Sequence, residues 1–282
     1  MGERRRRRGR GPLAALLAGA FTVGLPAVQA APSATVPVPK AAASVASSCP
    51  ASPYGVHHYA PGTGKTIALT FDDGPGANSR AVLVLLQAHR VAGTFFNIGV
   101  NQAVSPATVV TEKTHGFLLG NHTWNHPDMV RLSASAQAAE MDKASTEQSR
   151  IVGGAPCFFR PPYGSYNNTT LALARARHMS VWNWSVDTED WKARGSASSV
   201  WVKRIISRAE AGSRQAHPVI LMHNARSGDA ATVAALPTII VFYRDRGYTF
   251  VDLTGRSSRA VTRRRAAESL STGFRTHVRN RG

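Results

Sequence analysis

The feature that most constrains the fold is a regular alternation of short apolar runs with amphipathic segments of helical length, from about Cys49 to Leu253. Runs rich in β-branched and aromatic residues and bounded by turn residues are typical of buried strands. We expect seven strands, at Ile67–Phe71, Gly93–Ile98, Phe117–Gly120, Cys157–Phe159, Ser180–Ser185, Val219–Met222 and Tyr248–Val251. Strands separated by helices indicate an α/β fold with a parallel sheet, either doubly wound or closed as a barrel.

Helical spacing of apolar residues predicts the segments between these strands. In the first of them, Val82, Leu85, Leu86 and His89 recur at the period of one helix face. The expected helices are Ser79–Arg90, Pro106–His115, Ser133–Val152 with Ser133 as its N-cap, Thr169–His178, Ser198–Ala211 and Ala230–Arg246.

The first 48 residues have the layout of a leader. A run of arginines precedes the apolar stretch Leu13–Val23 and a small-residue site that ends at Ala30, as in secretory signal peptides. The apolar stretch is shorter than the roughly 20 residues of a spanning helix, so we expect secretion without a membrane span. Residues 31–48, rich in Ala, Pro, Ser and Val, are expected to be a flexible linker.

The formal net charge of +18 is concentrated partly in the last segment. From Arg256 to Gly282 there are eight arginines and one acid, Glu268, so residues 255–282 are expected to be a disordered basic tail after a domain at 49–254. Such a tail suits anionic cell-wall polymers, and a solvated tail without a partner is the alternative. Nucleic acid is not an expected partner of a secreted chain, and we expect a monomer.

Two cysteines, Cys49 and Cys157, allow one disulfide pairing. Secretion permits that bond, and two free thiols are the alternative. No CxxC spacing indicates a metal site at these cysteines.

Polar residues follow the ends of five predicted strands. They are Asp72 and Asp73, Asn121 and His122, Arg160, Asp187, and His223. Adjacent carboxylates repel each other, and a solvated turn is the simplest explanation of one such pair. Turn chemistry does not explain polar residues at the ends of five separate strands. They indicate the catalytic rim of a βα barrel, which is formed by the C-terminal ends of the strands and the loops that follow them.

His122 and His126 are four residues apart, a spacing that would align them on one face of a helical turn. With an aspartate from another strand end they would form a His₂Asp metal site, which leaves an open position for water. The other aspartate could take a proton from that water. His223, with an ordinary pKa of about 6.5, could protonate a leaving group.

Arg160 precedes a stiff Pro161-Pro162 loop. Its guanidinium could hold an aspartate ionised, or could form a purely structural ion pair. The loop could aim the backbone N–H of Tyr163 at a developing oxyanion. By strand alternation, Trp182 and Trp184 are expected in the core.

Five segments of the chain resemble the ordered motifs of a known family. They are TFDDGP (70–75), HTWNH (122–126), RPPYG (160–164), DTEDW (187–191) and LMH (221–223). This series, within roughly Lys65 to Leu253, is similar to that of the polysaccharide deacetylases, the NodB-homology enzymes of carbohydrate esterase family 4. The resemblance implies an irregular (β/α) barrel.

The resemblance also implies a role for each matching residue. Asp72 is similar to the general base, Arg160 to the residue that orients it, and the Tyr163 N–H to an oxyanion donor. The metal ligands would be Asp73, His122 and His126. His223 is similar to the general acid, supported by Asp190 or by Asp187. Two residues would line the substrate site, Leu221 and Trp191.

The resemblance thus implies a secreted hydrolase that uses Zn²⁺, or another divalent metal such as Co²⁺, to remove N-acetyl groups from an amino-sugar polymer such as peptidoglycan or chitin. An acetylxylan-type O-acetyl esterase with the same site and a non-catalytic wall-binding protein are the alternatives. Asn224 stands where many relatives have Asp. We expect altered local contacts there and no loss of activity.

Overall fold

The computed structural model describes residues 49, 55–194, 197–226 and 229–257, so the predicted signal peptide, linker and nearly all of the basic tail lie outside the described residues. Nine strands form its sheet: β1 (Val56–His57), β2 (Thr66–Asp72), β3 (Thr94–Asn97), β4 (Leu118–Asn121), β5 (Phe158–Phe159), β6 (Ser180–Trp182), β7 (Val186–Asp187), β8 (Val219–His223) and β9 (Thr249–Phe250).

The strands pair in the order β1-β6-β5-β4-β3-β2-β8-β7, and β9 pairs with the start of β2. Each pair of neighbouring strands in the sheet is parallel. Strands β2 to β6 follow one another in chain order, which is typical of a (β/α) barrel rather than of a doubly wound sheet. The expected irregular (β/α) barrel is therefore confirmed, and its strands point their carboxyl ends to one edge.

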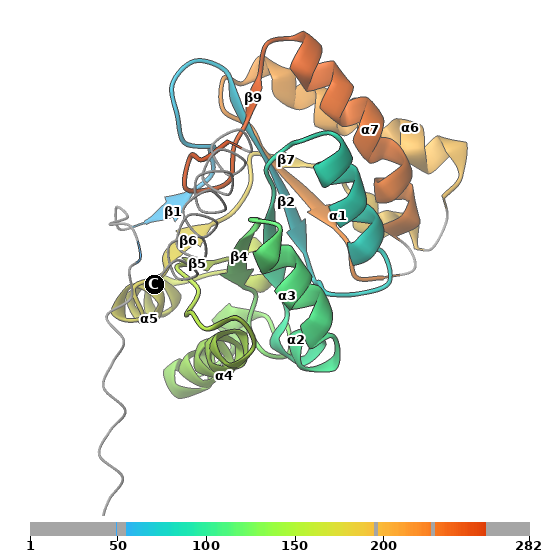
Figure 1. The fold of residues 1–282 in the computed structure, drawn as a ribbon. Coiled ribbons are helices and arrows are strands. Elements are labelled where there is room, and N and C mark those ends of the chain that lie inside the picture. Colours follow the sequence, from blue (N-terminus) through green and yellow to red (C-terminus); the bar gives the residue numbers. More distant parts are fainter. Residues whose placement is uncertain (1–48, 50–54, 195–196, 227–228, 258–282) are drawn as a thin grey trace, which may run out of the picture. The chain divides into compact units, whose positions relative to one another are not determined.

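In the described part of the chain, seven α-helices connect the strands, and Figure 1 shows α6 and α7 side by side. They are α1 (Ser79–Ala88), α2 (Gly99–Val104), α3 (Pro106–Thr114), α4 (Ala134–Val152), α5 (Asn168–Ala176), α6 (Ser199–Ala211) and α7 (Ala230–Asp245). Ser133 caps α4 as expected, because its hydroxyl accepts a hydrogen bond from the N–H of Ala136.

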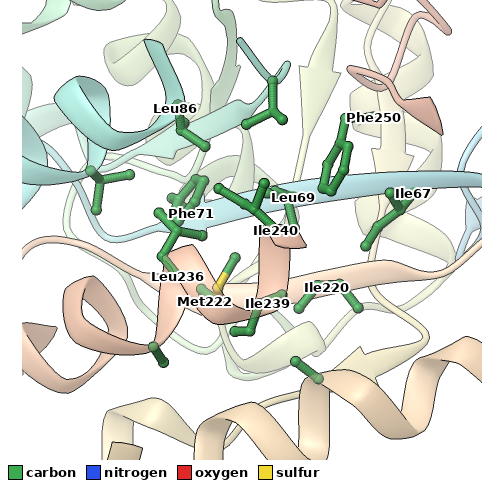
Figure 2. Close-up of a cluster of buried hydrophobic side chains, with 14 of the residues drawn as sticks. Ile67, Leu69, Phe71, Leu86, Ile220, Met222, Leu236, Ile239, Ile240 and Phe250 are labelled. Carbon is green, nitrogen blue, oxygen red and sulfur yellow. The ribbon is translucent and has the colours of Figure 1, made fainter. Parts of the chain in front are cut away.

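Strand β2 is buried along its whole length, and its alternating side chains face two different environments. Ile67, Leu69 and Phe71 point to the helical layer, where Figure 2 shows them with apolar residues of β8 and α7. Ala68 belongs to a second cluster on the other side of the strand. Asp72 shares the parity of Ala68, so its carboxylate points into the barrel interior rather than into the helical layer.

Three elements differ from the sequence prediction. The two-residue strand β1 and the six-residue helix α2 are too short to produce a readable period. The predicted strand Ser180–Ser185 ends at Trp182, and the chain pairs again only at β7. The carbonyl of Asn183 accepts a hydrogen bond from the Arg160 guanidinium instead of a strand partner, which accounts for the break.

Cys49 and Cys157 form a disulfide, with Cα atoms 5.2 Å apart, that ties the start of the described chain to the residue before β5. Within the described ranges, no helix is both long and apolar enough to cross a membrane.

Candidate active site

Asp72 and Arg160 form an ion pair inside the barrel. Arg160 follows β5 and is fully buried, and its Nη1 donates to Oδ1 of Asp72 and to the hydroxyl of Thr70, both at 2.8 Å. Its Nε and Nη2 donate to the carbonyls of Trp182 and Asn183 at 3.1 and 3.0 Å. The guanidinium is therefore held at three nitrogens, and it fixes the orientation of the Asp72 carboxylate.

Asp73 leaves the strand in a different direction from Asp72. Its φ of 71° is left-handed, so the chain turns at once and the two neighbouring carboxylates face different partners. Oδ2 of Asp73 accepts a hydrogen bond from Nη2 of Arg226 at 2.8 Å. Oδ1 is buried without a hydrogen-bond partner in the described part of the chain, 3.6 Å from Nε2 of His122 and 3.3 Å from Nε2 of His126.

The two histidines lie on a loop after β4, not on the helical turn that their spacing suggested. They converge because Thr123 and His126 adopt left-handed φ angles of 67° and 63°. Nδ1–H of His122 donates to the carbonyl of Arg160 at 2.7 Å, which leaves Nε2 directed at Asp73. The structure therefore brings the two histidines together, but through left-handed loop residues and not through a helical turn.

The donor set of Asp73, His122 and His126 fits a divalent metal ion. One ligand atom from each lies within 4.8 Å of the others, and the buried Asp73 oxygen otherwise has no partner. Burial would raise the pKa of Asp73, but the close approach of His122 and the charges of the nearby histidines lower it well below its usual range. Burial, with the charge of His122, lowers the pKa of His126 to about 4, so its imidazole is neutral at pH 7 and able to ligate.

His223 and Asp190 form the other half of the site. His223 ends β8, and its Nδ1–H donates to Oδ1 of Asp190 at 2.7 Å. Burial alone would lower the pKa of His223, but the charge and hydrogen bond of Asp190 raise it to about 10, with contributions from Asp73 and Asp72. The imidazole is thus protonated at pH 7. Asp187 instead accepts from the N–H of Glu189, so Asp190 is the carboxylate that contacts His223.

The residues expected to line the substrate site differ in exposure. Tyr163 is 68% exposed, has a left-handed φ of 60°, and packs its ring edge-to-face against His126 at 4.7 Å. Trp191 is 42% exposed, whereas Leu221 is buried on β8. Trp182 is buried and Trp184 packs against the same apolar cluster, as the alternation predicted.

Asn224 is fully buried beside the turn that follows Asp73. A Cβ on Gly74 would lie 2.6 Å from its Oδ1 and 2.7 Å from Oδ1 of Asn97, so this turn requires glycine. Within the described residues, neither polar atom of the Asn224 side chain has a hydrogen-bond partner. The expectation that this residue leaves activity intact stays a prediction.

Sequence reasoning missed three polar residues that support the site. Arg226 holds one oxygen of Asp73, Thr232 donates to Oδ2 of Asp190 at 2.6 Å, and Glu140 accepts from the backbone between the two histidines. Each lies on a helix or loop outside the five motifs. Their partners are 153, 42 and 15–16 residues away along the chain, so no local pattern marks them.

The fold is a parallel (β/α) barrel. At the C-terminal ends of its strands lie a cluster of one aspartate and two histidines, the Arg160–Asp72 ion pair and the His223–Asp190 pair. A family model described as polysaccharide deacetylase matches residues 59–182. A peptidoglycan-N-acetylglucosamine deacetylase of Bacillus cereus is 34% identical over 189 residues, which are 66% of this chain and 66% of that protein. The solved Bc1960 peptidoglycan N-acetylglucosamine deacetylase superposes with a TM-score of 0.65 at 32% identity, over 71% of this chain and 91% of that one.

The peptidoglycan-N-acetylglucosamine deacetylase PgdA of Listeria monocytogenes is 34% identical over 195 residues, which are 68% of this chain. The match spans only 38% of that protein, so the chain corresponds to part of this longer relative. The chain belongs to the polysaccharide deacetylase family.

Proposed function

We propose that this protein is a secreted, metal-dependent hydrolase that removes N-acetyl groups from an amino-sugar polymer, with peptidoglycan as the first candidate. The observation that carries the proposal is the placement of Oδ1 of Asp73. It lies buried and without a hydrogen-bond partner in the described chain, between two imidazole nitrogens and one peptide away from the Arg160-bound Asp72. The named activities of the family relatives support the choice of substrate.

Asp73, His122 and His126 would hold the metal, with Zn²⁺ or Co²⁺ as the first ions to test. When bound, such an ion polarises the acetyl carbonyl and lowers the pKa of water. The protein contributes the orientation of the ligands. The carbonyl of Arg160 fixes the His122 ring, and Arg226 occupies the second oxygen of Asp73, so that one oxygen stays directed at the histidines.

Asp72 would take the proton of the attacking water. Its Oδ1 is bound to Arg160, while Oδ2 lies 3.8 Å from Nε2 of His122, at the edge of the ligand cluster. The ion pair with the guanidinium holds this carboxylate in place and stops it from turning away from the water. The Tyr163 N–H is proposed to stabilise the tetrahedral oxyanion, because its loop packs against His126.

His223 would protonate the departing amine. The Asp190 carboxylate keeps the imidazole protonated and fixes Nδ1, so Nε2–H is the proton available for transfer. An amine is a poor leaving group without a proton, whereas an alkoxide from an O-acetyl ester leaves more easily. Leu221 would form a wall of the acetate pocket and Trp191 a wall of the sugar groove.

An acetate-release assay tests the proposal. The protein lacking residues 1–30 is incubated with peptidoglycan, chitin oligomers and acetylxylan, after chelation and again after adding Zn²⁺ or Co²⁺. Metal-dependent acetate release with new free amines on the amino-sugar polymers is the expected result. Release from acetylxylan alone would indicate the O-acetyl esterase, and binding without release would indicate the non-catalytic wall protein.

Comparing amide with ester cleavage sharpens the role of His223. His223→Ala should slow amide cleavage by about 10²–10⁴-fold and slow ester cleavage less, because only the amine requires a strong acid. Equal losses on both substrates would contradict this role.

We further propose that the protein acts outside the cell as a monomer and that the basic tail binds anionic wall polymers. Loss of wall binding on deletion of residues 258–282 would support the tail's role.

A further inference from the structure

The loop that joins His122 to His126 has an unfavourable backbone. Thr123 and His126 both have positive φ, at 67° and 63°. A left-handed conformation is rare for any non-glycine residue and is a genuine outlier for a β-branched one such as Thr123. Residues in such conformations persist only where the surroundings impose them. The metal-binding geometry proposed above therefore depends on contacts from outside the loop.

Glu140, on the second turn of α4, provides three of those contacts. Its Oε2 accepts hydrogen bonds from the backbone N–H of Trp124 at 2.9 Å and of Asn125 at 2.8 Å. Its Oε1 accepts from Nδ2 of Asn125 at 3.2 Å. Two consecutive N–H groups that converge on one carboxylate oxygen define the backbone orientation at the middle of the loop, and hydrogen bonds to a charged acceptor are the stronger kind.

The Trp124 side chain docks the loop on the same helix. Nζ of Lys143, one turn beyond Glu140, lies 4.2 Å from the Trp124 ring centroid. The ring also packs so closely on Gly99, at the start of α2, that a Cβ there would lie 2.4 Å from it. Helix α4 thus holds the segment between the histidines by its backbone and by its one large side chain.

We propose that Glu140 is a positioning residue for the metal site: it fixes the Trp124–Asn125 backbone so that His122 and His126 converge on Asp73. His122 has its own anchor in the carbonyl of Arg160. His126 is half-buried, its ring contacts Tyr163, and its backbone N–H bonds within the loop, to the hydroxyl of Thr123 at 3.0 Å. Loss of Glu140 should therefore release His126 first. The inference rests on the proposed metal site.

Zinc affinity of the chelator-stripped protein tests the inference. Calorimetric titration would compare Glu140→Ala and Glu140→Gln with Glu147→Gln. Glu147 lies two turns further along α4 and bonds to Arg150 of the same helix, so it is a matched control. Removal of groups that orient metal ligands typically costs 10–100-fold in affinity or activity. We expect about that loss for Glu140→Ala, a smaller loss for Glu140→Gln, whose amide oxygen still accepts, and no change for Glu147→Gln.

Two further readouts separate positioning from general stability. Amide hydrogen exchange at Trp124 and Asn125 should speed up in the metal-free Glu140→Ala variant, while the α4 amides stay protected. Its acetate release should recover at high zinc. A lower melting temperature with unchanged zinc affinity and unchanged exchange would overturn the inference and leave the proposed function standing. Wild-type protein that binds no divalent metal would overturn both. If Glu140→Ala does not fold, Glu140→Gln carries the same comparison.

Discussion

The two halves of the candidate site satisfy their polar groups in different ways. In the half built by His223, each oxygen of Asp190 has two protein donors: Oδ1 accepts from Nδ1 of His223 and the N–H of Trp191, and Oδ2 from the N–H of His223 and the hydroxyl of Thr232. In the other half, Oδ1 of Asp73 faces two imidazole nitrogens without a hydrogen bond.

This difference separates a half that the described chain completes by itself from a half that the proposed metal ion would complete. The Asp73 oxygen differs from other unpaired buried atoms because it lies between two imidazole nitrogens, a donor set that suits a metal ion. The Asp190–His223 pair needs no such partner, and its electrostatics are set by the fold. The two halves should consequently respond differently to metal removal and to mutation.

The largest expected effect is on the ligand half. His122→Ala should abolish stoichiometric zinc binding and reduce acetate release to background, because two remaining ligands do not form a three-ligand site. Metal content by mass spectrometry and acetate release are the measurements. His115→Ala, which changes an exposed histidine at the end of α3, is the control. Full zinc occupancy in His122→Ala would remove His122 from the site.

Asp72→Asn should separate catalysis from metal binding. The amide keeps the shape of the carboxylate but cannot take a proton, so kcat should fall by about 10²–10⁴-fold while zinc binding remains. The change also leaves the buried Arg160 without its counter-charge, so the melting temperature should fall. Near-normal deacetylation by a zinc-loaded Asp72→Asn protein would show that another group is the base.

In the self-contained half, Asp190→Asn should change the pH dependence of the reaction. The Asp190 carboxylate raises the pKa of His223 to about 10, so the acid stays protonated and active up to that region. Without the Asp190 carboxylate the pKa of His223 falls. As pH rises, the imidazole then loses its proton sooner, so the alkaline decline in activity begins at a lower pH. The pH profile of kcat measures this shift of the alkaline limb, with zinc affinity as the control. An unmoved alkaline limb would contradict the assignment of His223 as the acid.

The smallest expected effect is at Thr232. Thr232→Val removes one of four donors to Asp190 and leaves the other three in place. A lost hydrogen bond to a buried charged group costs about 1–3 kcal/mol of folding stability, so thermal unfolding should report the change. The rate should fall only a few-fold. A loss of rate as large as that of Asp190→Asn would show that the three remaining donors do not hold Asp190 in place for His223.

The sequence predicts an element or a site residue when its pattern lies within a few neighbouring residues. The buried strand β2 and the periodic helix α4 were readable because their side-chain patterns repeat within a few residues. The five motifs identified the residues at the strand ends for the same reason. The sequence left open whether Asp187 or Asp190 meets His223, because the choice depends on how η3 (Asp190–Ala193) packs against β8.

Residues that act through the fold left no such signal. The spacing of His122 and His126 predicts a helical turn, but they converge on a loop, because tertiary contacts impose left-handed φ angles on Thr123 and His126. Glu140 reads as an ordinary polar residue of an amphipathic helix. Its role follows only from the two N–H groups that α4 brings to it.

The proposed function requires a metal ion at Asp73, His122 and His126 for the release of acetate. The decisive measurement is acetate release from peptidoglycan by chelator-stripped protein, before and after one equivalent of Zn²⁺, with Asp73→Ala in parallel. We expect no release without metal, recovery on zinc addition, and no recovery in Asp73→Ala. Release that is unaffected by chelation, or equal recovery in Asp73→Ala, would contradict the proposed function.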